Sequence, residues 1–464
     1  MKSFSKLAFS LLLIALVAVS CKKDIADETT NEFKKVSEYD YQSIHQWNDM
    51  YAYLERYAAG FRPVGTAFSI GYIGLANYEA TVSGMPDYQS IASSMPGLNI
   101  PKAFTNQEYH WPTVVNAVNY TMFSNFFNRM DPKYYSKIKA LNDKLEKEYA
   151  GQVSAEVFTR SKNHGIAVAS AVWDWYRTDA VGFELYNDPF KGNNWQDRVN
   201  EPGAWVPTFP GPSDGLYAQG GNCRTFVIPE EMKLCKPYKD YVGTYTENPG
   251  KGLYLQALEV LDQQTSEKAY TTKWIGEFWS DDLLDVTFSP PTRWLAIANQ
   301  VFVNEKSTLE TAIVTNAKLG LAIGDAGIAA WHSKFVYNLL RPETYIQEVM
   351  DPSFDTNLYN PVTQETGVTP PFPAYPSGHA TFAGAASEIM SSIFGSSYSM
   401  TDRCHENRGD FLGTPRTFDS FKQMANEIAW SRVLLGVHFR CDGDEALALG
   451  NRIAKKVEEL PWKK

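Results

Sequence analysis

The spacing of apolar residues along the chain predicts helices. In residues 41–58, apolar side chains recur every three or four positions, as on one face of a helix: Ile44, Trp47, Tyr51, Leu54 and Tyr57. The same spacing predicts further helices at 110–129, 134–149, 154–177, 251–264, 266–283, 308–340, 378–394, 418–434 and 442–459. Strict alternation of apolar and polar residues, which would indicate strands, is scarce. We therefore expect an all-α fold.

Segments rich in glycine, proline, asparagine and aspartate separate the helical segments. They cover residues 178–250 and again the proline-rich stretch 351–376, and Pro290-Pro291 interrupts the pattern between two helices. A chain of 464 residues is long enough for more than one core. We expect two helical bundles: residues 39–250, which include a long loop, and residues 251–464.

The start of the chain has the pattern of an export signal. An apolar run over residues 7–19 follows a positively charged start and is too short for a comfortable membrane span. It ends in Ala18-Val19-Ser20-Cys21, which resembles the cleavage site of bacterial lipoproteins. This resemblance implies a signal peptide over residues 1–20, lipidation at Cys21 and a polar tether over 21–38. We expect an exported protein held in the bacterial envelope by its lipid alone; ordinary secretion is the alternative.

The remaining cysteines bear on the same question. An exported protein can form disulfides, and four cysteines allow three ways of forming two of them. Proximity along the chain favours Cys223 with Cys235, which leaves Cys404 with Cys441. No CxxC pair occurs, so the sequence does not indicate a zinc site.

The net charge of the chain argues against nucleic acid as a partner but does not argue against a small anion. A net charge of −10 argues against nucleic acid. A small anion needs only a local cluster of cations. Lys334 and Arg341 lie two helical turns apart, which predicts that both project from one face of the helix at 308–340, with Pro342 ending that helix. Alone, the pair could equally be surface residues reaching solvent.

A second segment, Pro376-Ser377-Gly378-His379, opens the small-residue helix at 378–394. Backbone N–H groups at the start of a helix lack partners within the helix and favour anions. Ser377 adds a hydroxyl donor, Gly378 allows close approach to the backbone, and His379 can transfer a proton. An ordinary helix cap is the alternative interpretation of these residues alone.

A third segment contains Arg432, His438 and Asp442. Arg432 can donate two hydrogen bonds to an oxyanion at once. His438 follows Gly436, where we expect the chain to leave its helix, and Asp442 can accept a hydrogen bond from one ring N–H of His438. The other nitrogen would then be available as a metal ligand or nucleophile. A buried structural His–Asp pair is the alternative.

Together the three segments resemble a known signature. Their order and spacing are Lys-x6-Arg-Pro, then Pro-Ser-Gly-His, then Ser-Arg-x5-His-x3-Asp. This resembles the three-part signature of the superfamily of type 2 phosphatidic acid phosphatases and vanadium haloperoxidases. Residues 277–281, 325–326 and 370–375 are similar to the haloperoxidase branch, and the size of the chain also fits that branch.

The resemblance implies a vanadate cofactor in a site that phosphate could also occupy. It implies that His438 binds the vanadium, that Asp442 orients His438, that His379 moves protons and that Lys334 polarises the peroxide. The residues implied to bind the cofactor's oxygens are Lys334, Arg341, Ser377, Gly378 and Arg432.

The resemblance also implies supporting residues. An acidic partner for Arg432 is expected at Asp281 or Asp282. Trp331, one helical turn before the signature lysine, and Phe372 are expected to line a halide pocket. Aromatic residues at these positions are similar to the chloroperoxidase and bacterial iodoperoxidase types, and export together with the chain's size favours the second. We therefore expect iodide as the preferred halide.

The function implied is that of a vanadium-dependent haloperoxidase, which oxidises halide with hydrogen peroxide to hypohalous acid that reacts with small organic acceptors. The main alternative is an exported acid phosphatase. There His438 would form a phosphohistidine, Asp442 would orient it, and His379 would protonate the leaving alcohol. A lipoprotein that only captures an oxyanion is a third possibility, but it would not require both histidines.

Overall fold

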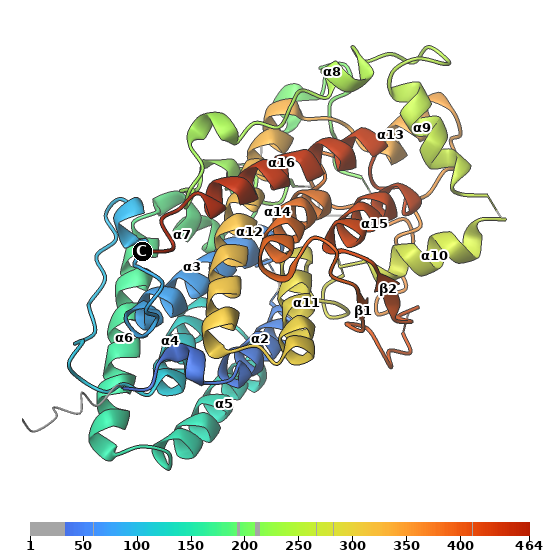
Figure 1. Cartoon of the computed structure of the whole chain (residues 1–464). Coiled ribbons are helices and arrows are strands. Elements are labelled where there is room, and N and C mark those ends of the chain that lie inside the picture. Colours follow the sequence, from blue (N-terminus) through green and yellow to red (C-terminus); the bar gives the residue numbers. More distant parts are fainter. Residues whose placement is uncertain are drawn as a thin grey trace, which may run out of the picture. The chain divides into compact units, whose positions relative to one another are not determined.

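Helices make up nearly all of the regular structure, as expected for an all-α fold (Figure 1). The computed structural model describes residues 33–464 except 59, 193–194, 209–213, 266, 282 and 411. Its α-helices are α2 (Gln42–Glu55), α3 (Val64–Thr81), α4 (Trp111–Phe126), α5 (Pro132–Ala150), α6 (Ala155–Arg177), α7 (Ala180–Asn187), α8 (Lys239–Val242), α9 (Leu253–Asp262), α10 (Ala269–Phe278), α11 (Pro290–Glu305), α12 (Leu309–Tyr337), α13 (Pro342–Val349), α14 (Gly378–Phe394), α15 (Phe421–Leu434) and α16 (Arg440–Glu458). Strands β1 (Met400–Asp402) and β2 (Arg416–Phe418) form one short antiparallel pair, with Met400 opposite Phe418.

Residues 34–464 form one compact unit. The division into bundles at residue 250 stays a prediction. The signal peptide, Cys21 and the first part of the tether lie outside the described residues. Among the helices that are described, none has both the length and the apolar character that a membrane span requires.

Helix starts follow local sequence signals. The Ser154 hydroxyl accepts a hydrogen bond from the Val157 N–H and so begins α6, and Asp131 caps α5 in the same way, with Pro132 as its first residue. Two of the predicted helices therefore lie close to where they were expected, at 134–149 and 154–177.

Helices α3 and α12 form a closely packed pair at the centre of the described unit. Every residue of α3 is buried. A Cβ atom on Gly320 of α12 would lie 2.6 Å from the Ile70 carbonyl oxygen, and one on Gly74 of α3 would lie 2.7 Å from that of Asn316. The two backbones therefore touch, which fixes α12 and with it Lys334 at its C-terminal end.

Helices α14 and α16 pack against α12, α15 packs against α14 and α16, and these three helices with the turn between α15 and α16 carry the second and third segments of the signature (Figure 1). Gly384 of α14 and Gly450 of α16 let these two helices approach closely, because a Cβ atom on Gly450 would collide with the Thr381 carbonyl oxygen. The N-terminal end of α14 is thereby held beside the segment that leads from α15 into α16.

The expectation that Lys334 and Arg341 share one helix is wrong. Helix α12 ends at Tyr337, and Asn338 adopts a left-handed conformation with φ of 51°. Arg341 is extended and caps α13, so Pro342 begins a helix and does not end one. The two cations reach the same site from two elements.

The expected disulfides are absent from the structure. Cys223, Cys235, Cys404 and Cys441 are all free thiols. Each faces neighbours of its own: the Cys235 sulfur lies 3.3 Å from the Tyr375 hydroxyl, and the Cys404 sulfur lies 3.2 Å from the Gln300 amide nitrogen. Proximity along the chain was misleading because the folded backbone directs these thiols into separate surroundings.

Candidate active site

The Ser377-Gly378-His379 segment begins α14, as predicted. Ser377 is the N-cap, and its hydroxyl accepts a bond from the Ala380 N–H at 3.4 Å. Its own N–H donates to the Asp442 carbonyl oxygen at 2.9 Å, which joins this helix start to the third segment of the signature. A Cβ atom on Gly378 would lie 3.2 Å from the Trp331 ring, so a larger residue here would require that ring to shift by a few tenths of an ångström. His379 follows in the first turn and is 7% exposed.

Lys334 lies in the last turn of α12 and is fully buried. Its ammonium group donates to the carbonyl oxygens of Pro373 (2.8 Å) and Ala374 (2.9 Å). An ammonium carries three donors, so one remains after these two bonds. The nitrogen also lies 4.9 Å from the centre of the Phe372 ring, a distance suited to a cation–π contact.

Arg341 connects the proline-rich loop to the segment that holds His438. Its Nε donates to the Phe372 carbonyl oxygen at 3.0 Å, and its Nη1 donates to that of Val437 at 2.8 Å. The same Nη1 lies 3.1 Å from Nε2 of His438. Since the guanidinium can only donate, Nε2 accepts in this contact.

The segment around His438 is shaped by the end of α15. Gly436 has φ of +77°, a conformation that favours glycine, and the N–H groups of Val437 and His438 return to the Arg432 carbonyl oxygen. Nδ1 of His438 lies 2.8 Å from the Asp442 carboxylate. Together with the Arg341 contact, this makes Nδ1 the protonated nitrogen and leaves the lone pair on Nε2.

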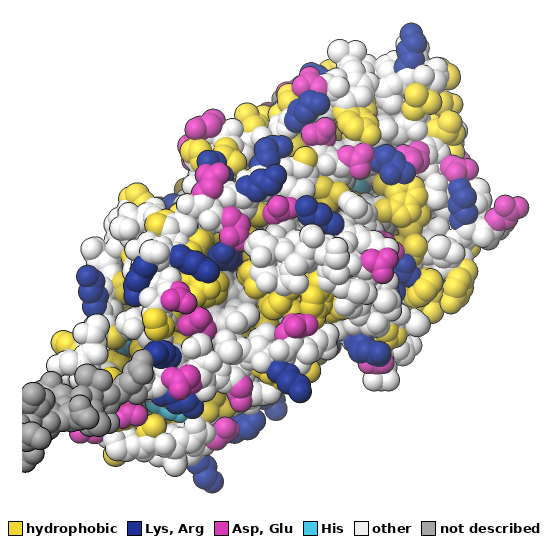
Figure 2. Space-filling model, in the orientation of Figure 1, with side chains coloured by type: hydrophobic (Ala, Val, Ile, Leu, Met, Phe, Trp, Pro, Cys, Tyr) yellow, Lys and Arg dark blue, Asp and Glu magenta, His cyan; other side chains and the backbone are white. Residues whose placement is uncertain are grey.

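Three cations of the site, Lys334, Arg341 and Arg432, are all fully buried, and we call them the cationic cage. They are distinct from the basic side chains seen on the surface, where Lys and Arg alternate with Asp and Glu (Figure 2). Burial lowers the pKa of Lys334 well below its usual value, and the charge of Arg341 lowers it further.

The histidine and carboxylate beside the cage respond to the same burial. The pKa of His438 is lowered well below its usual value by burial and then by Arg341 and Lys334, so the ring is neutral. Burial raises the pKa of Asp442 to about 7, which weakens the negative charge this carboxylate offers. Buried cations need a compensating anion. The donors of the cage and the N-terminus of α14 fit a tetrahedral oxyanion.

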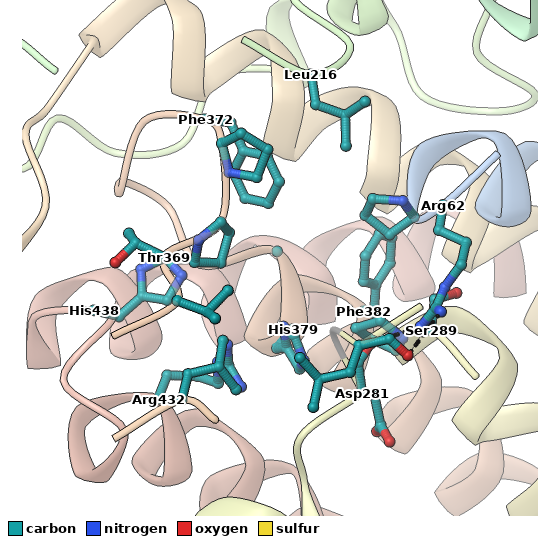
Figure 3. A pocket seen from close by; sticks show the side chains of 18 of the residues that line it. Arg62, Leu216, Asp281, Ser289, Thr369, Phe372, His379, Phe382, Arg432 and His438 are labelled. Atoms are coloured by element: carbon teal, nitrogen blue, oxygen red, sulfur yellow. Dashed lines mark hydrogen bonds between the residues drawn. The ribbon is translucent and has the colours of Figure 1, made fainter. Parts of the chain in front are cut away.

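A cavity of about 250 Å³ opens beside these residues (Figure 3). Six of the predicted site residues line it: Trp331, Phe372, Gly378, His379, Arg432 and His438. The ring centres of Trp331 and Phe372 lie 4.9 Å apart and form an aromatic part of its wall. The remaining predicted residues, Lys334, Arg341, Ser377 and Asp442, join the site through the bonds described above.

The proposed acidic partners of Arg432 are only partly described. The Asp281 carboxylate lies against Arg293, whose Nε is 3.0 Å away, and near His405 at 3.5 Å. Asp282 lies outside the described residues.

Several residues that line the cavity were not anticipated, and two of the polar ones are Arg62 and Ser289. Arg62 comes from the segment between α2 and α3, and Ser289 immediately precedes α11. Neither belongs to a local motif. Tertiary structure alone brings them to the site, so no sequence spacing could have indicated them.

The fold and the site together define an all-α protein with a buried cationic cage for a tetrahedral oxyanion. Residues 315–461 match the family model described as the second helical-bundle domain of VCPO. The vanadium chloroperoxidase of Curvularia inaequalis is 28% identical over 57% of this chain and 55% of its own length. A vanadium-dependent bromoperoxidase of Ascophyllum nodosum is 31% identical over 26% of this chain and 23% of its own length. The chain thus spans about half the length of the first of these relatives and less of the second.

Solved structures show the same fold. A structure described as the first bacterial vanadium-dependent iodoperoxidase superposes with a TM-score of 0.78 and 24% identity, covering 91% of this chain and 96% of that one. A holo-type bacterial vanadium-dependent chloroperoxidase superposes with a TM-score of 0.64 and 15% identity, covering 86% and 92%. The chain is thus similar to these vanadium haloperoxidases: it has the helical fold of the solved structures, and residues 315–461 match the second helical-bundle domain of VCPO.

Proposed function

We propose that this chain is a vanadium-dependent haloperoxidase that oxidises halide, preferably iodide, with hydrogen peroxide. The observation that carries the proposal is the protonation and orientation of the His438 ring. Asp442 fixes its Nδ1–H at 2.8 Å, and the lone pair on Nε2 lies against the cationic cage. A neutral, oriented imidazole beside three buried cations is the donor set that an anionic metal oxide needs.

When bound, vanadate would supply a vanadium(V) centre that activates peroxide as a Lewis acid. The chain's own residues would do the rest. His438 would provide the nitrogen ligand, and Lys334, Arg341 and Arg432 would neutralise the oxygens, with Ser377 and the Gly378 N–H as further donors. His379, at the cavity wall, would take and return the proton of peroxide.

The preference for iodide rests on two observations. Trp331 and Phe372 form an aromatic part of the cavity wall, which offers a large, weakly hydrated halide an apolar surface. The fold is also similar to that of a bacterial iodoperoxidase. Small organic acceptors would then react with the hypohalous acid that is released.

Reconstitution tests the proposal. Protein freed of bound oxyanion should gain peroxide-dependent iodide oxidation when vanadate is added, and bromide and chloride should give much slower turnover under the same conditions. Fast bromide or chloride turnover would remove the iodide preference. No halide turnover, together with rapid hydrolysis of a phosphate monoester, would favour the phosphatase alternative, because the same cage and His438 could serve a phosphohistidine.

We also propose that the protein is exported and anchored through a lipid on Cys21. Support comes from the apolar run at 7–19 and the small residues before Cys21. A Cys21→Ala variant should lose incorporation of labelled fatty acid and move from the membrane fraction to the soluble one. Unchanged labelling would contradict this proposal and leave the enzymatic one intact.

A further inference from the structure

We propose that Arg62 and Ser289 form a second anion subsite in the cavity and that it binds the halide co-substrate. This inference rests on the proposed function and names where one of its substrates binds. In Figure 3 the two residues lie together on one side of the view, His438 and Arg432 lie on the other, and His379 lies between. All five residues line the same cavity.

Among the described residues, Arg62 keeps N–H donors without a protein partner. Its side chain is 8% exposed. Nε lies 3.1 Å from the Glu55 carboxylate, Nη1 donates to the Leu283 carbonyl oxygen at 3.2 Å, and Nη2 donates to that of Asp281 at 3.3 Å. A guanidinium has five N–H donors, so these contacts leave two in a side chain that lines the cavity.

Ser289 adds a buried hydroxyl. It is 1% exposed, and within the described part of the chain its Oγ has no hydrogen-bond partner. Its backbone N–H donates to Glu55 at 2.9 Å, so Ser289 and Arg62 bind the same carboxylate. Ser289 is also the N-cap of α11, and its side chain makes no capping bond. A buried donor without a partner is costly, and an anion would satisfy it.

The position of Ser289 favours an anion over a neutral ligand. It stands at the N-terminal, positive end of a 16-residue helix. Pro290 and Pro291, which follow it, have no N–H to offer. The hydroxyl and the Arg62 guanidinium are therefore the donors that a ligand would meet there.

The charge balance selects a singly charged anion. Glu55 is fully buried and pairs with Arg62, so the subsite has little net positive charge. The nearby wall includes the apolar Leu283, Pro290 and Phe382, and the carboxylate of Asp281, which also lines the cavity, is paired with Arg293. A multiply charged oxyanion would be stabilised more strongly by the three positive charges of the cationic cage than by this wall. A guanidinium is itself weakly hydrated and suits a large halide with a loosely held water shell.

The cavity has room for both anions at once. A tetrahedral oxyanion displaces on the order of three waters, or about 90 Å³ at about 30 Å³ each. Within a cavity of about 250 Å³ this leaves space for a halide beside Arg62 and Ser289. The halide would therefore bind beside the cationic cage without displacing the oxyanion from it.

Anomalous scattering from crystals soaked in a bromide or iodide concentration series tests the subsite without turnover. We expect a halide peak within hydrogen-bond distance of the Arg62 guanidinium and Ser289 Oγ. Ser289→Ala should weaken halide binding about tenfold, the effect of one hydrogen bond to a charged group. The KM for iodide should rise similarly, while the KM for peroxide and the retention of vanadate should not change.

Thr292→Val is the matched control. Thr292 lies in the same first turn of α11, and it too has a buried hydroxyl without a partner among the described residues, but it does not line the cavity. Halide peaks elsewhere in the cavity, or equal halide binding by the two variants, would overturn the inference. A filled subsite without halide oxidation would instead contradict the proposed function, and turnover with the subsite empty would contradict the subsite alone.

Discussion

At the scale of residues, the two site histidines have different surroundings. His438 is held from both ring nitrogens, by the Asp442 carboxylate at 2.8 Å and by Arg341 at 3.1 Å. His379 lies in the first turn of α14 on the wall of the cavity, where a substrate can reach it. The first arrangement suits a fixed ligand, and the second suits a group that exchanges protons.

Replacing each histidine should therefore have a different effect. His438→Ala should abolish retention of vanadate through gel filtration, because it removes the nitrogen ligand. His379→Ala should retain vanadate and slow iodide oxidation by about 10²–10⁴-fold, the usual value of a positioned acid–base group. His332→Ala, at a partly buried histidine that does not line the cavity, serves as the control. Equal loss of vanadate in the His438 and His379 variants would show that the roles are not divided in this way.

At the scale of elements, the packing of α3 against α12 holds one side of the site. The contact depends on glycines, because the carbonyl oxygen of Ile70 lies where a side chain on Gly320 would begin. Backbone cannot rotate away as a side chain can, so even one methyl group must push the helices apart.

Gly320→Ala should lower the free energy of unfolding by about 1–3 kcal/mol, the usual cost of overpacking a core. Gly409→Ala is the control, since a Cβ atom there meets nothing within 4 Å. Urea unfolding of the two variants measures the difference. Equal stability would mean that the α3–α12 contact adjusts easily and does not fix α12.

The same elements show what sequence patterns can predict. The amphipathic helix at 154–177 was predicted closely because one face is polar, and α6 spans Ala155–Arg177. Helix α3 was missed because all its residues are buried, so it has no polar face to reveal the period. Helix α11 was missed because Pro290-Pro291 was interpreted as an interruption, whereas proline commonly occupies the first turn of a helix.

The site residues also differ in whether local sequence could predict them. The Ser377 cap and the His438–Asp442 pair were predicted because their partners lie a few residues apart, within the reach of local geometry. Arg341 reaches the site although the helix argument for it was wrong, since the chain turns at Asn338. Arg62 and Ser289 depend on contacts between distant segments, which no local spacing encodes.

At the scale of the whole molecule, buried ionisable groups act on acid stability in opposite directions. Burial lowers the pKa of His110 to about 4, whereas its unfolded value is near 6.5. Burial raises the pKa of Asp325 to about 6, from an unfolded value near 3.8. Between pH values of about 4 and 6.5, the unfolded chain binds the proton of His110 more readily than the folded chain does. Between pH values of about 3.8 and 6, the folded chain binds the proton of Asp325 more readily than the unfolded chain does.

Single variants should separate these effects. Since His110 makes stability rise with pH between about 4 and 6.5, His110→Gln should lower the slope of the unfolding free energy by up to about 1.4 kcal/mol per pH unit. Asp325 makes stability fall as pH rises from about 4 to 6, so Asp325→Asn should raise the slope by a similar amount. Urea unfolding measured across this range gives both slopes, and changes of the same sign would contradict the assignment.

The origin of the cavity wall has a consequence for how such proteins diversify. Arg62 and Pro63 form part of the wall from the early part of the chain, while the cationic cage comes entirely from later residues. A recombination event that exchanged the early helices would alter which substrates enter and would leave the oxyanion chemistry in place. The part of the selectivity that depends on Arg62 and Pro63 can thus be inherited separately from reactivity, and chimaeras of related chains offer a route to new acceptors that leaves the cage residues unchanged.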